Sequence, residues 1–282
     1  MNIYFEPIKK IVEALKIQGA RNDYIVNAVK EYLQLRVLNC LYNNRRYNQQ
    51  LIFTGGICLR LCFALPRLSE DLDFDYTGNL DIEKLSDDLE NYFSKIMMLP
   101  QVTTTIKGKS RKIYIKLPIL NDLGLAFGGS AILYLKVEAA PLRAVMQPAE
   151  ITPISREGLY FFIQRFSLSD LMAGKINAFL TRMFYKGKTN EVDFKGRDVF
   201  DLIWYAGQGI KPNFKRLEGL LAGTIYEGKS EEEILGLVQQ KLNAVKKQHV
   251  LLDVGQFIQD QAMLENFLDH YLDIFAQYCR QY

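Results

Sequence analysis

The segment at residues 53–76, FTGGICLRLCFALPRLSEDLDFDY, decides the fold, because it places a Gly-Gly turn shortly before three aspartates at alternate positions. The apolar run at residues 51–53 predicts a buried strand that leads into the turn. Residues 57–65 predict a short apolar helix, which ends before Pro66. We therefore expect a strand, a glycine turn and a helix in direct succession.

The glycine turn consists of Gly55 and Gly56 at the start of this helix. Unpaired backbone N–H groups and the positive end of the helix dipole favour an anion at such a position, and glycine lets a phosphate approach the backbone closely. A Gly-Gly pair alone indicates only a turn. Its place between a strand and a helix is what suggests a phosphate site.

The acidic stretch that follows alternates in polarity, as a strand with one polar face does. Adjacent carboxylates repel each other unless a cation lies between them, and hard oxygen ligands suit Mg²⁺, with Mn²⁺ as a substitute. A solvated sheet face would show the same alternation. The residues that we expect to share the polar face are Ser69, Asp71, Asp73 and Asp75.

The remaining pattern predicts an α/β (α+β) protein that ends in helices. We expect a long helix at residues 24–41, capped by Asn22 or Asp23, and another at residues 81–97. Beyond Pro153 the pattern is helical, with a strand-like hinge at residues 160–166. Further strands are expected at residues 102–107, 112–120 and 131–139, and helix N-caps at Ser167, Ser169 and Ser230.

Glu138 is the only carboxylate on the expected strand at residues 131–139. Two-metal phosphoryl chemistry uses shared carboxylates to hold both ions, and a third acid beside Asp71 and Asp73 would complete such a site. Glu138 is our candidate for this third position, as a metal ligand or as the base. A glutamate on an edge strand that faces water is the simpler alternative.

Two later segments carry charges at helical spacing. Lys175 and Arg182 lie seven residues apart and are expected on one helix face, where two cations could meet a triphosphate. Asp198 and Asp201 lie three residues apart and share another face. A surface ion-pair network between the two helices would explain the same charges.

These segments together resemble a known group of proteins. GGICLR and RLSEDLDFD are similar to motifs of the nucleotidyltransferase superfamily, the DNA polymerase beta-like fold, and in particular of its AbiEii/AbiGii toxin family. LMAGKINAFLTR at residues 171–182 resembles the lysine-bearing helix of that family, and RDVFDL at residues 197–202 resembles its RD-x-x-DL motif. Four motifs in the same order are more specific than any one of them.

The resemblance implies a nucleotidyltransferase-type mixed sheet with flanking helices, followed by a helical bundle. We place the catalytic domain at residues 1–165 and the helical domain at residues 166–282, with the latter contributing to the active site. The resemblance further assigns catalytic roles to Asp71, Asp73, Glu138, Lys175, Asp198 and Asp201, metal binding to Asp71, Asp73 and Glu138, and nucleotide binding to Gly55, Gly56, Ser69, Lys175 and Arg182.

The function that this resemblance implies is Mg²⁺-dependent transfer of a nucleotide from an NTP to an acceptor, with tRNA as the expected acceptor. It also implies the toxin of a toxin–antitoxin or abortive-infection phage-defence system, controlled by a separate antitoxin. Two alternatives remain open. The chain could be an NTP- or GTP-binding effector without turnover, or it could modify a hydroxyl group of a protein or a small molecule.

Composition restricts the remaining possibilities. The formal net charge of the 282 residues is only +3, which excludes a strongly basic nucleic-acid coat. No apolar run is long enough to cross a bilayer and the first residues do not resemble a signal peptide, so we expect a cytoplasmic protein that does not contact a membrane. Cys58 and Cys62 are expected to be reduced core residues, because no histidine cluster completes a zinc site.

A basic hairpin is the candidate contact for RNA. Strand alternation places Tyr114 on the same face as two of its lysines, and aromatic rings among cations suit stacking and phosphate contacts. Lysines also protect exposed edge strands from aggregation, which is the simpler explanation. The basic residues of this hairpin are Lys107, Lys109, Arg111, Lys112 and Lys116.

Overall fold

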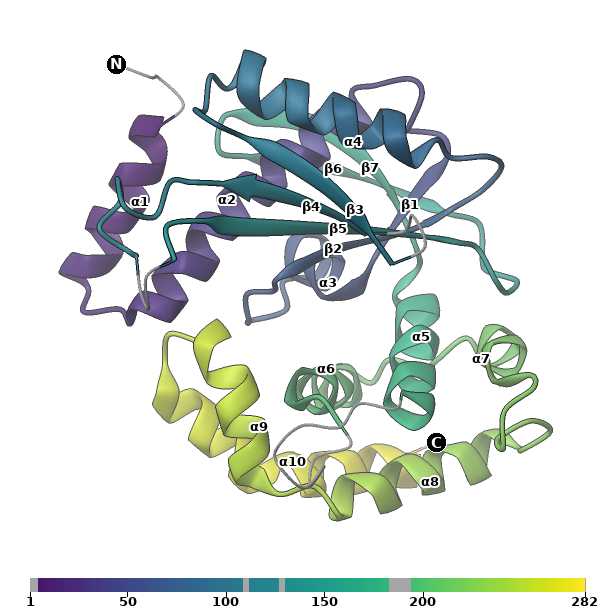
Figure 1. Ribbon diagram of the computed structural model, residues 1–282. Helices are drawn as coiled ribbons and strands as arrows, with labels where there is room; N and C mark the ends of the chain where they lie inside the picture. The colour runs from purple at the N-terminus through teal and green to yellow at the C-terminus, as the bar shows by residue number, and fades with distance from the viewer. Residues whose placement is uncertain (1–4, 109–111, 127–129, 183–193, 282) are drawn as a thin grey trace. The chain divides into compact units, whose positions relative to one another are not determined.

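The computed structural model describes residues 5–108, 112–126, 130–182 and 194–281 (Figure 1). The chain divides into two compact units. The first unit contains Met1–Leu142 and Glu150–Arg165, and the second contains Arg143–Ala149 and Phe166–Tyr282. The predicted domain boundary at residue 165 agrees with this division except for Arg143–Ala149, which belongs to the second unit.

The first unit is built around one sheet of seven strands. The strands are β1 (Leu51–Thr54), β2 (Asp71–Tyr76), β3 (Thr103–Lys107), β4 (Lys112–Leu117), β5 (Leu133–Pro141), β6 (Glu150–Arg156) and β7 (Leu159–Arg165). Their order is β3-β4-β5-β2-β1-β7-β6. The pairs β2–β5 and β1–β7 are parallel and the others are antiparallel, so the sheet is mixed. The predicted fold class, a mixed sheet with flanking helices, is confirmed.

One face of this sheet is apolar and the other is polar. Leu72 and Phe74 of β2 are buried, and so is Val137 of β5, the partner of Leu72 across the parallel pair. Their neighbours Asp71 and Asp73 point to the opposite face, because successive strand residues alternate. Burial of each large apolar side chain contributes about 1.5–3 kcal/mol, so the core fixes the direction of the aspartates.

The helices of the first unit pack against the strands or against one another (Figure 1). They are α1 (Phe5–Ile17), α2 (Asn22–Tyr42), α3 (Gly55–Phe63) and α4 (Ile82–Asn91), which continues as a π-helical turn at Tyr92–Ile96. Helix α2 packs on β5 and β7, and α4 packs on β3 and β4. The expected cap of α2 at Asn22 or Asp23 is wrong, because Arg21 occupies the N-cap position and its side chain forms no capping hydrogen bond.

The hairpin β6–β7 corrects the prediction for residues 153–166. Strand β7 is an internal strand rather than a hinge, and it pairs in parallel with β1 through Arg165 and Phe53. Strand β6 was missed because most of it is exposed, and the proline within it fits the edge of a sheet, where a ladder donor is not needed. Glu157 and Gly158 both have positive φ, which suits the two-residue turn between the strands.

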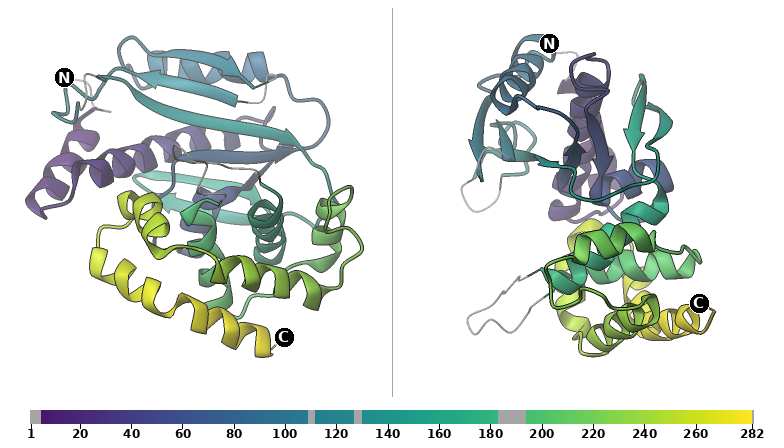
Figure 2. Two further views of the ribbon diagram at one scale, coloured as in Figure 1. Left: turned by 60° about the horizontal axis from the view of Figure 1, so that its bottom comes forward. Right: turned by 90° about the vertical axis from the view of Figure 1, so that its right-hand side faces the viewer.

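The second unit is helical, as predicted. Its helices are α5 (Leu168–Thr181), α6 (Gly196–Gly207), α7 (Phe214–Leu221), α8 (Glu231–Asn243), α9 (Lys247–Val254) and α10 (Gln261–Gln281). Helix α6 packs against α5, α9 and α10, and α8 and α10 lie side by side (Figure 2). The predicted caps at Ser167 and Ser230 are confirmed, since each side chain accepts a hydrogen bond from a backbone N–H of the first turn. The predicted cap at Ser169 is wrong, because this residue lies inside α5.

Arg143–Ala149 joins the second unit through hydrogen bonds to buried side chains. The carboxylate of Asp170 accepts from the backbone N–H of Gln147 at 2.9 Å and from Asn213 Nδ2 at 2.6 Å. Arg216 Nη1 donates to the carbonyl oxygen of Ala144 at 3.2 Å. Since Asp170 and Arg216 are both buried, this segment is held by contacts that sequence alone does not reveal.

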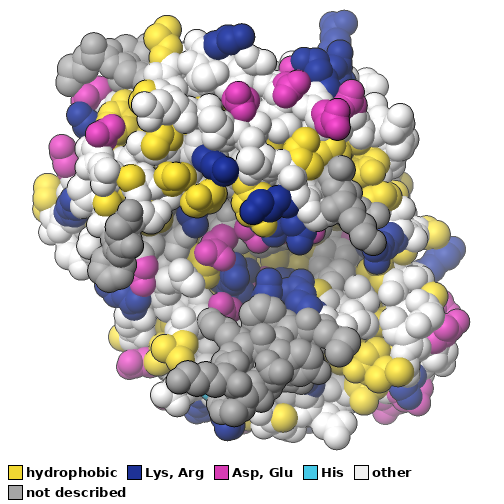
Figure 3. Space-filling view, in the orientation of Figure 1, with side chains coloured by type: hydrophobic (Ala, Val, Ile, Leu, Met, Phe, Trp, Pro, Cys, Tyr) yellow, Lys and Arg dark blue, Asp and Glu magenta, His cyan; other side chains and the backbone are white. Residues whose placement is uncertain are grey.

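The distribution of charged side chains, the state of the cysteines and the length of the apolar helices can be compared with what the composition predicts. Acidic and basic side chains are interspersed on the face seen in Figure 3, without a continuous basic coat. The four cysteines are free, with Cys58 buried and Cys62 partly exposed, so only Cys58 fits the expected core position fully. None of the helices among the described residues is both long and apolar enough to cross a membrane.

The close crossing of α6 and α9 leads to a stability prediction. A Cβ atom on Gly196 would lie 2.9 Å from Val250 Cα and 3.0 Å from Val250 O, and backbone atoms cannot easily move aside. We expect Gly196→Ala to destabilise the protein by about 1–3 kcal/mol, as overpacked sites do. Thermal unfolding would measure this as a loss of several degrees in Tm.

Gly236→Ala is the matched control for this prediction. Gly236 lies in α8, and a Cβ atom there would meet nothing within 4 Å. This substitution should be neutral or stabilise by about 0.5–1 kcal/mol, because alanine favours helix. Equal Tm values for the two variants would contradict the proposed close contact.

Candidate active site

The first turn of α3 lies against the carboxylate of Asp73. Helix α3 begins at Gly55, with Thr54 at its N-cap, and Thr54 pairs with Asp73 across strands β1 and β2. A Cβ atom on Gly55 would lie 2.3 Å from Asp73 Oδ2, and φ at Gly55 is +78°. Only glycine fits both the backbone conformation and the space. The glycine turn thus brings a helix N-terminus next to an aspartate.

The second glycine makes room for two buried polar side chains. A Cβ atom on Gly56 would lie 2.6 Å from Ser69 Oγ and 2.9 Å from Arg67 Nη2. Ser69 lies before β2, which begins at Asp71, so the expectation that it would share the strand face is corrected. Arg67 was missed by sequence reasoning, although it begins the RLSEDLDFD motif and is almost fully buried.

The approach to β2 is fixed by hydrogen bonds. Gln34 Nε2 in α2 donates to the carbonyl oxygens of Ser69 and Glu70, at 3.3 and 2.8 Å. Arg67 Nη1 donates to the carbonyl oxygen of Leu68 at 2.9 Å. These contacts satisfy backbone acceptors just before the strand and hold the segment that carries the aspartates in register.

The parallel pair β2–β5 brings Glu138 beside the aspartates. Asp73 is the register partner of Glu138, and Asp71 is the partner of Lys136. Register partners lie on the same face of the sheet, so all four side chains are neighbours on its polar face. Glu138 therefore lies on the strand predicted for it, next to the aspartates of β2.

Lys136 lies between two of these carboxylates. Its Nζ is 3.0 Å from Asp71 Oδ2 and 2.9 Å from Glu138 Oε2, while Lys112 Nζ is 3.6 Å from Glu138 Oε2. Burial alone would lower the pKa of Lys136, but the negative charges of Asp71 and Glu138 raise it above its usual value. The ammonium is therefore charged at neutral pH.

This ammonium was not anticipated from the sequence. Lys136 is two residues from Glu138, and strand alternation alone would have placed both on one face. Within the described ranges, no group of three or more His, Cys, Asp and Glu side chains is arranged to hold a metal ion. The assignment of Asp71, Asp73 and Glu138 as metal ligands stays a prediction.

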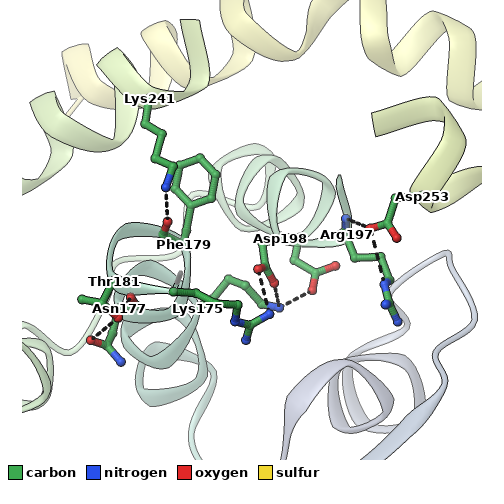
Figure 4. Close-up of polar contacts among 10 residues, drawn as sticks. Lys175, Asn177, Phe179, Thr181, Arg197, Asp198, Lys241 and Asp253 are labelled. Carbon is green, nitrogen blue, oxygen red and sulfur yellow. Dashed lines mark hydrogen bonds and ion pairs between the residues drawn. The ribbon is translucent and has the colours of Figure 1, made fainter. Parts of the chain in front are cut away.

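The second unit contains its own cluster of charged side chains, on α5 and α6 (Figure 4). Lys175 Nζ lies 2.9 Å from Asp198 Oδ1 and 2.8 Å from Asp201 Oδ2. Arg182 Nη1 lies 3.2 Å from Asp198 Oδ2. The aspartates and Lys175 are largely buried, so the cluster is not the surface ion-pair network considered as an alternative.

Arg182 reaches this cluster from outside the helix. Helix α5 ends at Thr181, and Arg182 follows in an extended conformation with φ −68° and ψ 121°. The expected helix face shared by Lys175 and Arg182 is therefore wrong, although both cations contact Asp198. The two cations are neighbours, as their spacing predicted, but they do not share a helix face. The helix ends before Arg182, although its apolar pattern predicted a longer helix.

The charge state of Asp198 follows from its surroundings. Burial would raise the pKa of this carboxyl group, but the cations Lys175 and Arg182 together lower it below its usual value. We predicted that Lys175 and Asp198 act in one site together with the aspartates of the first unit. This assignment stays a prediction.

Asp198 should therefore stabilise the fold in a pH-dependent way. Its folded-state pKa is lowered, so its stabilisation is full above the unfolded pKa of about 3.9 and is lost as pH falls through the folded pKa. We expect Asp198→Asn to cost about 3 kcal/mol at pH 7, because it breaks a buried ion pair. Urea unfolding at a series of pH values should show the difference from the native protein shrinking below about pH 4.

Asp269→Asn provides the control for this prediction. Asp269 pairs with Lys247 at 3.0 Å, but its side chain is 69% exposed. Exposed pairs contribute about 0–1 kcal/mol, so this variant should unfold like the native protein. A loss at Asp198 that equals the loss at Asp269 would contradict the buried pairing.

Comparisons with known proteins agree on the fold. The structure is similar to the nucleotidyltransferase toxin MenT4 from Mycobacterium tuberculosis, with a TM-score of 0.55 and 15% identity over 96% of this chain and 92% of that chain. It is also similar to JHP933 from Helicobacter pylori, with a TM-score of 0.50 and 17% identity over 90% and 92% of the two chains. At such identities the likeness concerns the fold alone. Among curated proteins, none is significantly similar.

A family model that matches most of the sequence decides the family. The model of the nucleotidyl transferase AbiEii toxin family, described as part of a type IV toxin–antitoxin system, matches residues 36–274. This range includes the glycine turn, the aspartates of β2 and the charged cluster of α5 and α6. The chain therefore belongs to the AbiEii family of nucleotidyltransferase toxins of type IV toxin–antitoxin systems.

Proposed function

We propose that this toxin is a Mg²⁺-dependent enzyme that transfers a nucleotide from an NTP to RNA, with tRNA as its acceptor. The observation that carries the proposal is the position of Asp73 against the N-terminus of α3, with Asp71 two residues earlier on the same strand. A helix N-terminus suits phosphates, and paired carboxylates suit the cation that accompanies them.

The donor set of the polar face fits Mg²⁺. Asp71 and Asp73 offer only oxygen atoms, and Mg²⁺ usually takes one or two protein carboxylates and completes its coordination with water and substrate phosphate. Mn²⁺ accepts the same ligands. When bound there, the ion would neutralise phosphate charge and orient the NTP.

The glycine turn would receive the phosphates of the NTP. Backbone N–H groups in the first turn of a helix have no partner within the helix, and such a turn suits an anion. The buried pair of Arg67 and Ser69 lies behind Gly56, and we assign it to hold the turn and to add positive charge. We assign Ser69 an indirect role in nucleotide binding, because its hydroxyl group lies against Gly56 and supports the turn.

Glu138 is the candidate base for the acceptor hydroxyl group. Its carboxylate lies next to that of Asp73 across the sheet and is held by Lys136 and Lys112. A carboxylate fixed in this way can accept a proton while the hydroxyl oxygen attacks the α-phosphate of the NTP and pyrophosphate leaves.

The charged cluster of the second unit supplies a further proposed phosphate contact. We assign Lys175 to neutralise the triphosphate, with Arg182 beside it. Asp198 and Asp201 hold the Lys175 ammonium at 2.9 and 2.8 Å, which fixes its position within that unit. Positioning of this kind lowers the entropy cost of binding a substrate.

The polar face of β3, β4 and β5 is the proposed path for RNA. Lys107 Nζ lies 5.5 Å from the centre of the Tyr114 ring, and Lys116 pairs across the sheet with Tyr134, which is 44% exposed. Exposed aromatic rings among lysines suit single-stranded RNA. The expected residues Lys109 and Arg111 lie outside the described residues.

The cellular consequence follows from the family and the proposed acceptor. Modification of tRNA would stop translation and so restrict growth or phage propagation. A separate antitoxin would control this activity, as expected for a type IV system. Transfer to RNA in the cell would place the protein in the cytoplasm.

Nucleotide transfer can be tested with labelled NTPs and total bacterial tRNA in the presence of Mg²⁺. We expect label from one NTP to appear on the RNA. Asp71→Asn and Asp73→Asn should each lower the rate about 10²-fold or more, because several kcal/mol of charge stabilisation are lost. Asp75→Asn, on the same strand and face, should retain activity.

The other outcomes of this experiment are informative. Label on no RNA, with NTP binding intact, would contradict the proposal and favour a protein or small-molecule acceptor, or an effector without turnover. Equal loss in all three variants would point to a general change of the strand rather than to specific ligands.

The RNA path can be tested by charge removal on the strands. We expect the double variant Lys107→Gln, Lys116→Gln to raise the KM for tRNA about tenfold with kcat unchanged. The slope of log affinity against log salt concentration should become shallower by an amount that corresponds to about one to two phosphate contacts. Lys246→Gln with Lys247→Gln, which removes the same charge from exposed positions of the second unit, should change neither value. Equal effects of the two pairs would contradict this path.

A further inference from the structure

Lys136 occupies the place where a cation is expected among the carboxylates. Its ammonium group bridges Asp71 and Glu138 at 3.0 and 2.9 Å, the distances of direct charged hydrogen bonds. The side chain of Lys136 is 20% exposed, and those of the two acids are 31% exposed. This is a partly buried, two-sided contact rather than a loose surface pair.

Sheet register makes this contact a fixed feature of the fold. Lys136 is the partner of Asp71 across β2 and β5, and it precedes Glu138 by two residues on the same strand. Three side chains with these positions must share one face, and the buried residues between them prevent a slip of register. The register therefore places the Lys136 side chain next to both acids, and its ammonium group contacts each of them.

An ammonium group and a divalent ion cannot share this position. A metal ion bound to Asp71 would lie close to the positive charge of Lys136, and like charges repel strongly at a partly buried site. The carboxylates already have a counter-charge before any metal arrives. Metal binding must then displace the ammonium.

We propose that Lys136 is a built-in competitor of the metal ion, so that Asp71 binds a divalent ion only after the Lys136 ammonium has left it. This inference rests on the proposed metal site of the transferase. A triphosphate would offer the released ammonium a new anionic partner. The competition therefore makes metal binding weak in the free protein and links it to the arrival of the nucleotide.

Mn²⁺ binding to the nucleotide-free protein tests this competition directly. Free Mn²⁺ would be measured by electron paramagnetic resonance during titration of the native protein and of Lys136→Met. We expect the variant to bind Mn²⁺ about tenfold more tightly, because a neighbouring positive charge is removed. Lys136→Arg retains the charge and should bind like the native protein. Lys136→Gln serves the same purpose if the methionine variant does not fold.

Two further variants show where the additional metal binds. Asp71→Asn introduced into Lys136→Met should abolish the gain. Lys247→Met releases Asp269 from a 3.0 Å pair elsewhere in the chain and should give no gain, which excludes general binding to any freed carboxylate. Unchanged or weaker Mn²⁺ affinity in Lys136→Met and Lys136→Gln would overturn the inference.

This measurement is independent of catalysis. Tighter Mn²⁺ binding in Lys136→Met together with no labelled RNA in the native protein would support the competition and contradict the proposed transfer. RNA labelling together with unchanged Mn²⁺ affinity would support the transfer and overturn the competition.

Discussion

The close contact between Gly55 and Asp73 is the constraint on which the polar face of the sheet depends. Strand β1 ends at Thr54 opposite Asp73, and α3 must begin at once with its first residue against that carboxylate. A side chain at Gly55 would force the strand and the helix apart. The position of β2, and with it the pairing of β2 to β5, follows from this one approach. The acids and Lys136 become neighbours as a result.

Both units compensate the charge of their partly or fully buried carboxylates with a lysine. Each unit holds a lysine between two acids: Lys136 between Asp71 and Glu138 in the first, and Lys175 between Asp198 and Asp201 in the second. Partly buried carboxylates need such partners, because an unpaired charge away from water is costly. The two lysines differ in how they are held. One depends on sheet register and the other on packing between two helices.

The sequence was most informative where spacing follows directly from backbone geometry. The strand before the glycine turn, the alternation of β2 and the strand that carries Glu138 follow from the two-residue period of a strand and from short apolar runs. The end of α5 and the hairpin β6–β7 could not be obtained in this way, because Arg182 and the exposed strand β6 are placed by tertiary contacts. Strand alternation places Lys136 on the same face as Glu138, but alternation alone does not predict which acid a flexible lysine side chain will contact.

The segment Arg143–Ala149 has a consequence for the modular history of the chain. It leaves the sheet unit after β5, docks on Asp170 and Arg216, and returns to form β6. The covalent chain therefore passes between the units at three places. Neither unit is a continuous piece of sequence, so a gene fragment cut at residue 165 would deprive the buried side chains of Asp170 and Arg216 of hydrogen-bond partners. Recombination or truncation could exchange such units only by carrying this short segment along.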